Sequence, residues 1–207
     1  GTLSARRVAR WDGESWHALG DGFDLRVTAL ALDAEGRLVA GGLFTESGGK
    51  ALAKIARFDG TAWTAVGAGL EGEEGFVNAL VRHGEHVLVG GWFTAIDGEP
   101  AAGLARIEGD ALVPVLPGVT FQDDVISFVS GIAPYKDGYF ITGMFDRAGE
   151  ANASFVAYHD GETWHALADG IADIGETVAV TKDGLMVGGP FLQASGLSSV
   201  GLARWSF

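Results

Sequence analysis

One phrase returns along the whole length of the chain. The segment "VARWDG" at 8–13 recurs as "IARFDG" at 55–60, "LARIEG" at 104–109 and "VAYHDG" at 156–161. A second phrase, first seen as "VAGGLFTESGG" at 39–49, recurs at 88–98, 141–149 and 186–196 with nearly the same spacing. Two independent landmarks with one period identify an internal repeat. A period of about 40–50 residues is typical of folds in which small units pack only against their neighbours.

Each period contains four short segments with alternating apolar and polar residues. In the first period these segments are 26–33, 37–45, 52–59 and 62–67, and Asp-Gly or Glu-Gly steps join the last two in most periods. Such steps between alternating runs favour hairpins, because the turn requires positive φ. No segment has the spacing of an amphipathic helix. The sequence therefore predicts an all-β fold, a β-propeller of four-stranded antiparallel blades.

The paired glycines in the second phrase are unusual for a strand, which glycine weakens. Gly41 and Gly42 lie inside an apolar run, and the pair recurs as Gly90-Gly91 and Gly188-Gly189, whereas the third period has Gly143 alone. Glycine inside a strand marks a bulge or the close approach of a neighbouring backbone or ring. We interpret these glycines as packing sites between blades. A phosphate-binding loop would require a helix after the glycines, and none is predicted.

We predict one domain over 1–207 with four encoded blades. The repeats cover 26–67, 76–116, 125–167 and 176–207, and the segment 14–19 supplies the missing strand of the last blade. This assignment closes the ring through the two termini. It leaves 6–12 and 201–207 in competition for one position. The alternative is an incomplete ring, which belongs to a longer array or assembles with a second copy, so the chain is a monomer or, if incomplete, a homodimer.

The phrase "IARFDG", followed by a Trp and then by "GGxFT", resembles the repeats of bacterial surface and secreted β-propellers of the kelch or galactose-oxidase-like kind. The resemblance covers nearly the whole chain. It implies an extracellular, cell-surface or periplasmic protein and a non-catalytic binding or scaffold role. The copper ligands of galactose oxidase have no matching motif here, so the resemblance implies no copper chemistry.

The charge of the chain narrows the class of partner. Acidic residues outnumber basic ones by 27 to 14, and the net charge is −13. Nucleic acid would be repelled by such a surface. No apolar run is long enough to cross a membrane, and no cysteine is present for disulfides or thiolate sites. We interpret the chain, which starts at Gly1, as a mature or excised piece. The expected partner is a protein or a glycan.

In a propeller, the connections between blades and those between second and third strands emerge on one face. In this chain they carry most of the acids. We expect the ligand on this face, near the starts of the innermost strands. The candidate ligand-binding residues are Asp24, Thr28, Glu73, Glu74, Asn78, Asp123, Asp124, Ser127, Asp173 and Glu176.

Two alternatives to simple binding start from the same acids. Carboxylates favour Ca²⁺, and Glu73, Asp123 and Asp124 are the candidate ligands; otherwise no cofactor is expected. A pair of carboxylates at the channel mouth would instead suit a glycan-processing enzyme, although only Glu176 lies at a strand start. A third alternative is an excised or artificial repeat fragment, half of a larger ring, without an activity of its own.

Arginines recur at 10, 57, 106 and 204, and we expect them to pair with acids or carbonyls between blades.

Overall fold

The computed structural model of the chain describes residues 4–71, 75–122 and 126–207. Over these ranges the chain forms strands and turns, with no helix that could cross a membrane.

Three antiparallel sheets have four strands each and follow one another in the sequence. Sheet 1 consists of β3 (Val27–Leu32), β4 (Leu38–Gly42), β7 (Ile55–Phe58) and β8 (Trp63–Ala65). Sheet 2 consists of β9 (Phe76–His83), β10 (His86–Trp92), β13 (Leu104–Glu108) and β14 (Ala111–Pro114). Sheet 3 consists of β16 (Phe128–Tyr135), β17 (Gly138–Met144), β20 (Val156–His159) and β21 (Trp164–Ala166).

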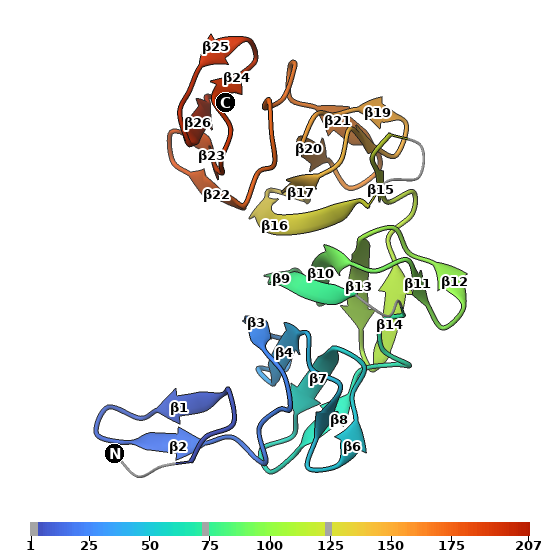
Figure 1. Cartoon of the computed structure of the whole chain (residues 1–207), viewed down its shortest axis with the longest axis vertical. Helices are drawn as coiled ribbons and strands as arrows, with labels where there is room; N and C mark the ends of the chain where they lie inside the picture. The colour runs from blue at the N-terminus through green and yellow to red at the C-terminus, as the bar shows by residue number, and fades with distance from the viewer. Residues whose placement is uncertain (1–3, 72–74, 123–125) are drawn as a thin grey trace.

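The two ends of the chain form smaller sheets. Sheet 4 has the three strands β22 (Thr177–Thr181), β23 (Gly184–Gly188) and β26 (Leu202–Trp205). At the other end, β1 (Ala9–Trp11) and β2 (Trp16–Ala18) pair only with each other. The sheets are arranged along an open arc, with the β1–β2 hairpin at one end and sheet 4 at the other (Figure 1). The all-β prediction and the predicted four-stranded antiparallel sheets are confirmed.

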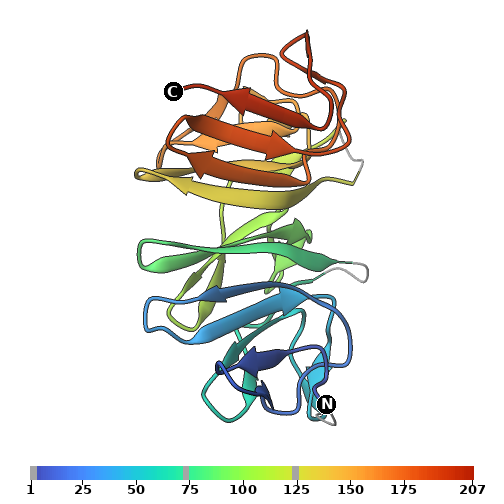
Figure 2. The ribbon, with the colours of Figure 1, turned by 90° about the vertical axis from the view of Figure 1, so that its left-hand side faces the viewer.

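The first strands of the four sheets line the concave side of the arc. β3 contacts β9, β9 contacts β16, and β16 contacts β22. Seen from the concave side, these strands lie side by side across the molecule (Figure 2). This is the order expected in a propeller, in which the first strand of each sheet is the innermost.

The predicted closure through the termini is not present in this structure. Residues 14–19 were expected to complete the last sheet, but β2 is held at the start of the arc. Its end is fixed by Trp63, whose Nε1 donates a hydrogen bond of 2.9 Å to the Leu19 carbonyl. Val8, which precedes β1, is buried in an apolar cluster with Phe23 and Phe44. These contacts place the hairpin against sheet 1, so sheet 4 keeps an open edge.

The connection between the second and third strands of each sheet forms a small hairpin, which was not predicted from the sequence. The four hairpins pair β5 (Glu46–Ser47) with β6 (Lys50–Ala51), β11 (Ala95–Ile96) with β12 (Glu99–Pro100), β18 (Arg147–Ala148) with β19 (Ala151–Asn152), and β24 (Gln193–Ala194) with β25 (Leu197–Ser198). The segment leading into each sheet lies against that sheet's own hairpin. In sheet 3 this segment is β15 (Val119–Thr120), which pairs with β18. The connections between successive sheets and the hairpins between second and third strands therefore lie on one face, as predicted. We call it the loop face.

The paired glycines have two different roles. A methyl group at Gly41 would lie 2.5 Å from Cγ1 of Val77 in the next sheet, so the first glycine admits a neighbouring side chain. A methyl group at Gly42 would lie 2.1 Å from the Arg26 carbonyl oxygen, beside a bulge in β3. Gly90 and Gly91 repeat both relations in sheet 2. The predicted packing role and the predicted bulge are both confirmed, although an aliphatic side chain, not a ring, meets the first glycine.

Candidate functional site

The predicted polar residues at the starts of the innermost strands bridge neighbouring sheets. The Thr28 hydroxyl donates to the Val77 carbonyl of sheet 2, and Asn78 Nδ2 donates to the Val129 carbonyl of sheet 3 at 3.4 Å. Ser130 occupies the same position in sheet 3 and donates to the Gly175 carbonyl. Ser127, the residue predicted for this position, lies three residues too early in the chain. Thr28 and Asn78 thus make contacts within the arc, and their role in ligand binding stays a prediction.

Several acids on the loop face hold the connecting segments in place. Asp24 accepts hydrogen bonds from the Thr45 amide and hydroxyl, at 2.9 and 2.7 Å, and from the Glu46 amide at 3.0 Å. Burial acts to raise the pKa of Asp24, but these hydrogen bonds outweigh it and lower the pKa. Glu71 accepts from the Gly98 amide at 2.7 Å in the corresponding part of sheet 2. Part of the acidity of this face therefore serves the fold.

The remaining predicted residues are not brought together into one site. Asp173 is exposed and accepts a hydrogen bond from the neighbouring Ile174 amide at 2.7 Å. Glu176 is also exposed, and its backbone amide donates to the Gly188 carbonyl at 2.8 Å. Four predicted residues, among them all three candidate Ca²⁺ ligands, lie outside the described residues: Glu73, Glu74, Asp123 and Asp124. Within 4–71, 75–122 and 126–207, no three His or acidic side chains are grouped so that they could hold a metal ion.

One predicted residue, Ser127, lines a pocket of about 380 Å³ on the loop face between sheets 2 and 3. On one side the pocket is bounded by the end of β10 and the β11–β12 hairpin of sheet 2. On the other side it is bounded by β15 and the residues before β16. Its lining residues are Trp92, Phe93, Thr94, Pro100, Ala102, Val119, Thr120, Phe121, Ile126 and Ser127. We call this the aromatic pocket.

Two aromatic side chains on opposite sides give this pocket its character. Trp92 packs edge-on against Phe76, with ring centroids 5.8 Å apart, and is half-buried. Phe121, across the pocket, contacts the Phe155 ring at 5.9 Å and is also half-buried. Among the described lining residues none is charged, and hydroxyls come from two threonines and Ser127, whose Oγ donates to the Val119 carbonyl at 3.1 Å. The pocket combines ring faces with a few neutral polar groups, as small-molecule sites do.

Trp92, which was not predicted as a site residue, stands out within the repeat. The residue between the second glycine and the phenylalanine of the second phrase is Leu43, Trp92, Met144 or Pro190 in the four periods. Trp92 is the single aromatic residue at this otherwise aliphatic or Pro position. Phe121 and Ile126 had no comparable signal, because they belong to an irregular connection without a counterpart in the other periods.

A second, smaller pocket of about 210 Å³ lies on the opposite face, also between sheets 2 and 3. It is lined by His83, His86, Leu88, Arg106, Val115, Asp137, Tyr139, His159 and Gly161. Burial raises the pKa of the Tyr139 hydroxyl and lowers the pKa of His159. In sheet 1, Asp33 occupies the position of His83 and pairs with Arg57, whereas Arg106 here pairs with Glu108.

Residues 86–110, which include β10 and β13, match a family model described as a domain of unknown function (DUF5122) beta-propeller. No curated protein matches the chain. Together with the antiparallel sheets, the match supports membership of a β-propeller repeat family. The finer resemblance to kelch or galactose-oxidase-like propellers stays a prediction.

Proposed function

We propose that the chain is a non-catalytic binding module of a secreted or surface protein, and that it takes one sugar residue of a glycan in the aromatic pocket. The observation that carries the proposal is that two half-buried aromatic side chains, Trp92 and Phe121, line one pocket on the loop face. A sugar ring presents apolar C–H faces to aromatic rings and hydroxyls at its rim. The hydroxyls of Thr94, Thr120 and Ser127 suit that rim.

The described lining residues of the pocket favour a sugar over a charged group. Its volume of about 380 Å³ is within the range of small-molecule sites, and no described lining residue is charged. A basic peptide would require a carboxylate inside the pocket to compensate a buried cation. The net charge of −13 on the chain as a whole repels anionic glycans and therefore disfavours their binding.

Binding is favoured over glycan processing by the same lining. Glycoside hydrolysis uses two carboxyl groups about 5–10 Å apart beside the bond that breaks. No carboxyl group is among the described residues that line the aromatic pocket. The proposed ligand is therefore held without a general acid or a nucleophile from these residues.

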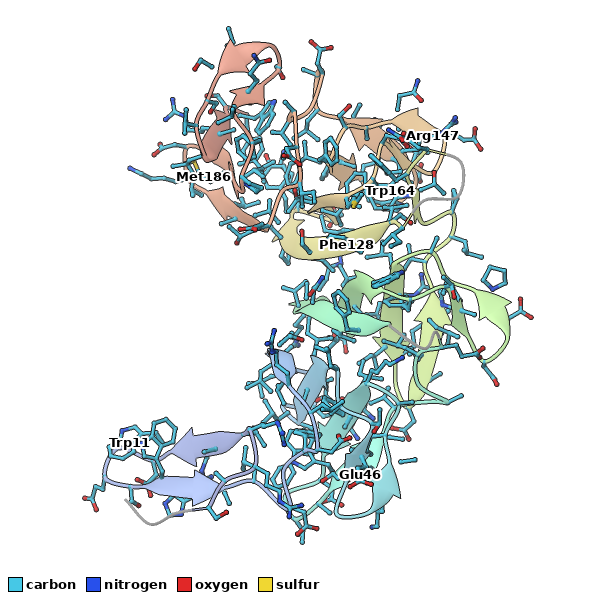
Figure 3. All side chains as sticks on the ribbon, viewed as in Figure 1. Trp11, Glu46, Phe128, Arg147, Trp164 and Met186 are labelled. Carbon is cyan, nitrogen blue, oxygen red and sulfur yellow. The ribbon has the colours of Figure 1, made fainter. Side chains whose placement is uncertain are left out.

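The proposal predicts that Trp92→Ala weakens binding of a neutral oligosaccharide by about tenfold or more, because the main ring surface is lost. A panel of neutral oligosaccharides is titrated against the chain with tryptophan fluorescence and calorimetry, with and without Ca²⁺. Trp11→Ala is the matched control, since Trp11 is exposed on the β1–β2 hairpin far from the pocket (Figure 3). Equal affinities for Trp92→Ala and the native chain, or no binding across the panel, would reject the proposal. Binding of a basic peptide but of no sugar would assign the pocket to protein recognition instead.

A further inference from the structure

The pocket of about 210 Å³ on the opposite face lies at the junction of sheets 2 and 3, and three of its lining residues are histidines. We call it the histidine pocket. At the junction of sheets 1 and 2, a salt bridge takes the same place. Its carboxylate, Asp33, accepts hydrogen bonds from the Arg37 amide at 2.8 Å and from Arg37 Nε at 2.9 Å, and lies 3.0 Å from Arg57 Nε. The Asp33 carboxylate thus compensates the charge of a buried arginine.

Sheet 2 keeps one arginine of this arrangement but has no acid in the place of Asp33. The strand registers align three pairs of positions: Asp33 with His83, Arg37 with His86, and Arg57 with Arg106. An imidazole therefore stands where sheet 1 has its carboxylate. All three positions in sheet 2 can donate hydrogen bonds, and none of the three carries an acid to receive them.

The donors of the histidine pocket are largely unused. Arg106 donates through Nε to Glu108 of its own strand, and its two terminal nitrogens make no hydrogen bond to the residues that the structure describes. The Gly161 amide donates to Nδ1 of His159 at 3.1 Å, so the proton of the neutral ring lies on Nε2. Nδ1 of His86 is buried and has no hydrogen-bond partner among the described residues. The pocket therefore has N–H groups to offer to a ligand.

Sheet 3 holds its part of the pocket in a fixed arrangement. The rings of Tyr139 and His159 are stacked, with centroids 5.2 Å apart and an angle of 13° between their planes. Trp164 packs edge-on against both rings, at 5.9 and 4.7 Å. Burial raises the pKa of the Tyr139 hydroxyl, which therefore keeps its proton at neutral pH. Side chains that are already positioned lose little conformational entropy when a ligand binds.

Two acids lie near these donors, but neither takes the role that Asp33 has in sheet 1. Glu108 is half-buried and engages Arg106 through Nε alone. Asp137 lines the pocket from the exposed turn between β16 and β17. In the part of the chain that the structure describes, no ion pair joins Asp137 to Arg106. The guanidinium end of Arg106 is thus left for an anion from outside the chain.

We infer that the histidine pocket binds the carboxylate of a small aliphatic acid, in the place that the Asp33 side chain takes in sheet 1. The terminal nitrogens of Arg106 match the two oxygens of a carboxylate, and the imidazoles and the Tyr139 hydroxyl supply further donors. Leu88 and Val115 line the pocket as well and suit a short apolar body. The volume of about 210 Å³ limits the ligand to a few heavy atoms. This site is independent of the sugar proposed for the aromatic pocket on the other face.

The test titrates the chain with butyrate at neutral pH and constant ionic strength, and follows the imidazole signals by nuclear magnetic resonance. We expect saturable shifts of the His86 and His159 signals and none of His17, which lies on the β1–β2 hairpin. Butyramide, which has the same apolar body without the charge, should shift none of them. No saturable shift up to about 50 mM butyrate would overturn the inference. Binding of inorganic phosphate but not of butyrate would overturn the assignment to a carboxylate.

Arg106→Gln should weaken butyrate binding by at least about tenfold, because the charged fork is lost. Arg10→Gln is the matched control. Arg10 occupies the same position of the repeat and its loss changes the net charge equally, but its side chain is exposed on β1. Equal weakening by both variants would show a general effect of charge and would contradict a site at Arg106.

His83→Asp gives the most specific result. This variant supplies from within the chain the carboxylate that Asp33 supplies in sheet 1, so it should abolish butyrate binding while the urea midpoint of unfolding stays equal or rises. His83→Asn adds no charge, and it should bind butyrate within about threefold of the native affinity. Circular dichroism checks that each variant is folded. A folded His83→Asp chain that binds butyrate as tightly as the native chain would overturn the inference, and if that variant does not fold, the Arg106→Gln result decides.

Discussion

Gly90→Thr should destabilise the chain by about 2–3 kcal/mol, and adding Val129→Gly should recover most of that loss. Cβ at position 90 would lie 2.7 Å from Cγ1 of Val129 and 3.1 Å from Cδ1 of Ile132, so the single variant overpacks the contact between sheets 2 and 3. Val129→Gly alone should also destabilise, because it leaves a cavity. The double variant reproduces the Thr142–Gly175 pair that the chain already uses between sheets 3 and 4.

Urea unfolding of the four chains in this cycle measures the coupling between the two positions. We expect a coupling free energy of about 1–3 kcal/mol that favours the double variant. Additive losses would show that positions 90 and 129 do not meet, which contradicts the packing of sheet 2 on sheet 3.

Asp33→Ala should cost about 3–5 kcal/mol, because it removes the buried carboxylate beside the buried Arg57 guanidinium. Both side chains are almost completely buried, and Arg57 Nε lies 3.0 Å from Asp33 Oδ2 without making a linear hydrogen bond to it. Arg57 also reaches Asp110 and the Gly109 carbonyl of sheet 2. Arg57 therefore connects two sheets, as predicted. The prediction does not hold for Arg106, which pairs with Glu108 of its own strand, and Arg10 and Arg204 are exposed.

Glu35→Ala is the matched control for Asp33→Ala. Glu35 Oε2 lies 3.0 Å from Arg37 Nη2, the same distance as in the Asp33–Arg57 pair, but the Glu35 side chain is largely exposed. Its loss should change the free energy of unfolding by less than about 1 kcal/mol. A similar cost for both variants would contradict the assignment of the Asp33–Arg57 pair as a buried contact.

The effect of Asp33→Ala should depend on pH. Burial acts to raise the pKa of Asp33, but hydrogen bonds from Arg37 and the charges of Arg37 and Arg57 together hold it below its usual value. A carboxyl group with a lowered pKa in the folded state stabilises that state above its unfolded pKa, about 3.9. This stabilisation is lost as the pH falls through the lowered value. The difference between native and variant chains should be constant above about pH 5 and shrink below about pH 4.

The repeat made most of the fold predictable. Its two phrases gave the antiparallel sheets, and the glycines gave the close approach between them. The polar position of the third period was missed because Ser127 and Ser130 both lie near the start of this strand; the bulge that contains Thr28 and Asn78 in sheets 1 and 2 recurs at Ser130. The closure was wrong for a related reason. Two similar segments, 8–12 and 202–206, fit one position, and contacts of Val8 and Leu19 with sheet 1 decide between them.

The candidate site was less predictable than the fold. Acids drew attention to the loop face, but Asp24 and Glu71 are engaged by backbone amides there. Trp92 could have been found as the aromatic exception in its position of the repeat. Phe121 and Ile126 reach the pocket through an irregular connection, whose path depends on its pairing with β18 and not on a local pattern.

The packing of successive sheets can be tested most directly by nuclear Overhauser effects in the labelled chain. We predict contacts between the Gly41 α-protons and the Val77 methyl groups, and between the Gly90 α-protons and the Val129 methyl groups, across each junction. The absence of both, with the methyl groups of Val77 and Val129 in contact with other partners, would contradict the arc of sheets on which the aromatic pocket depends.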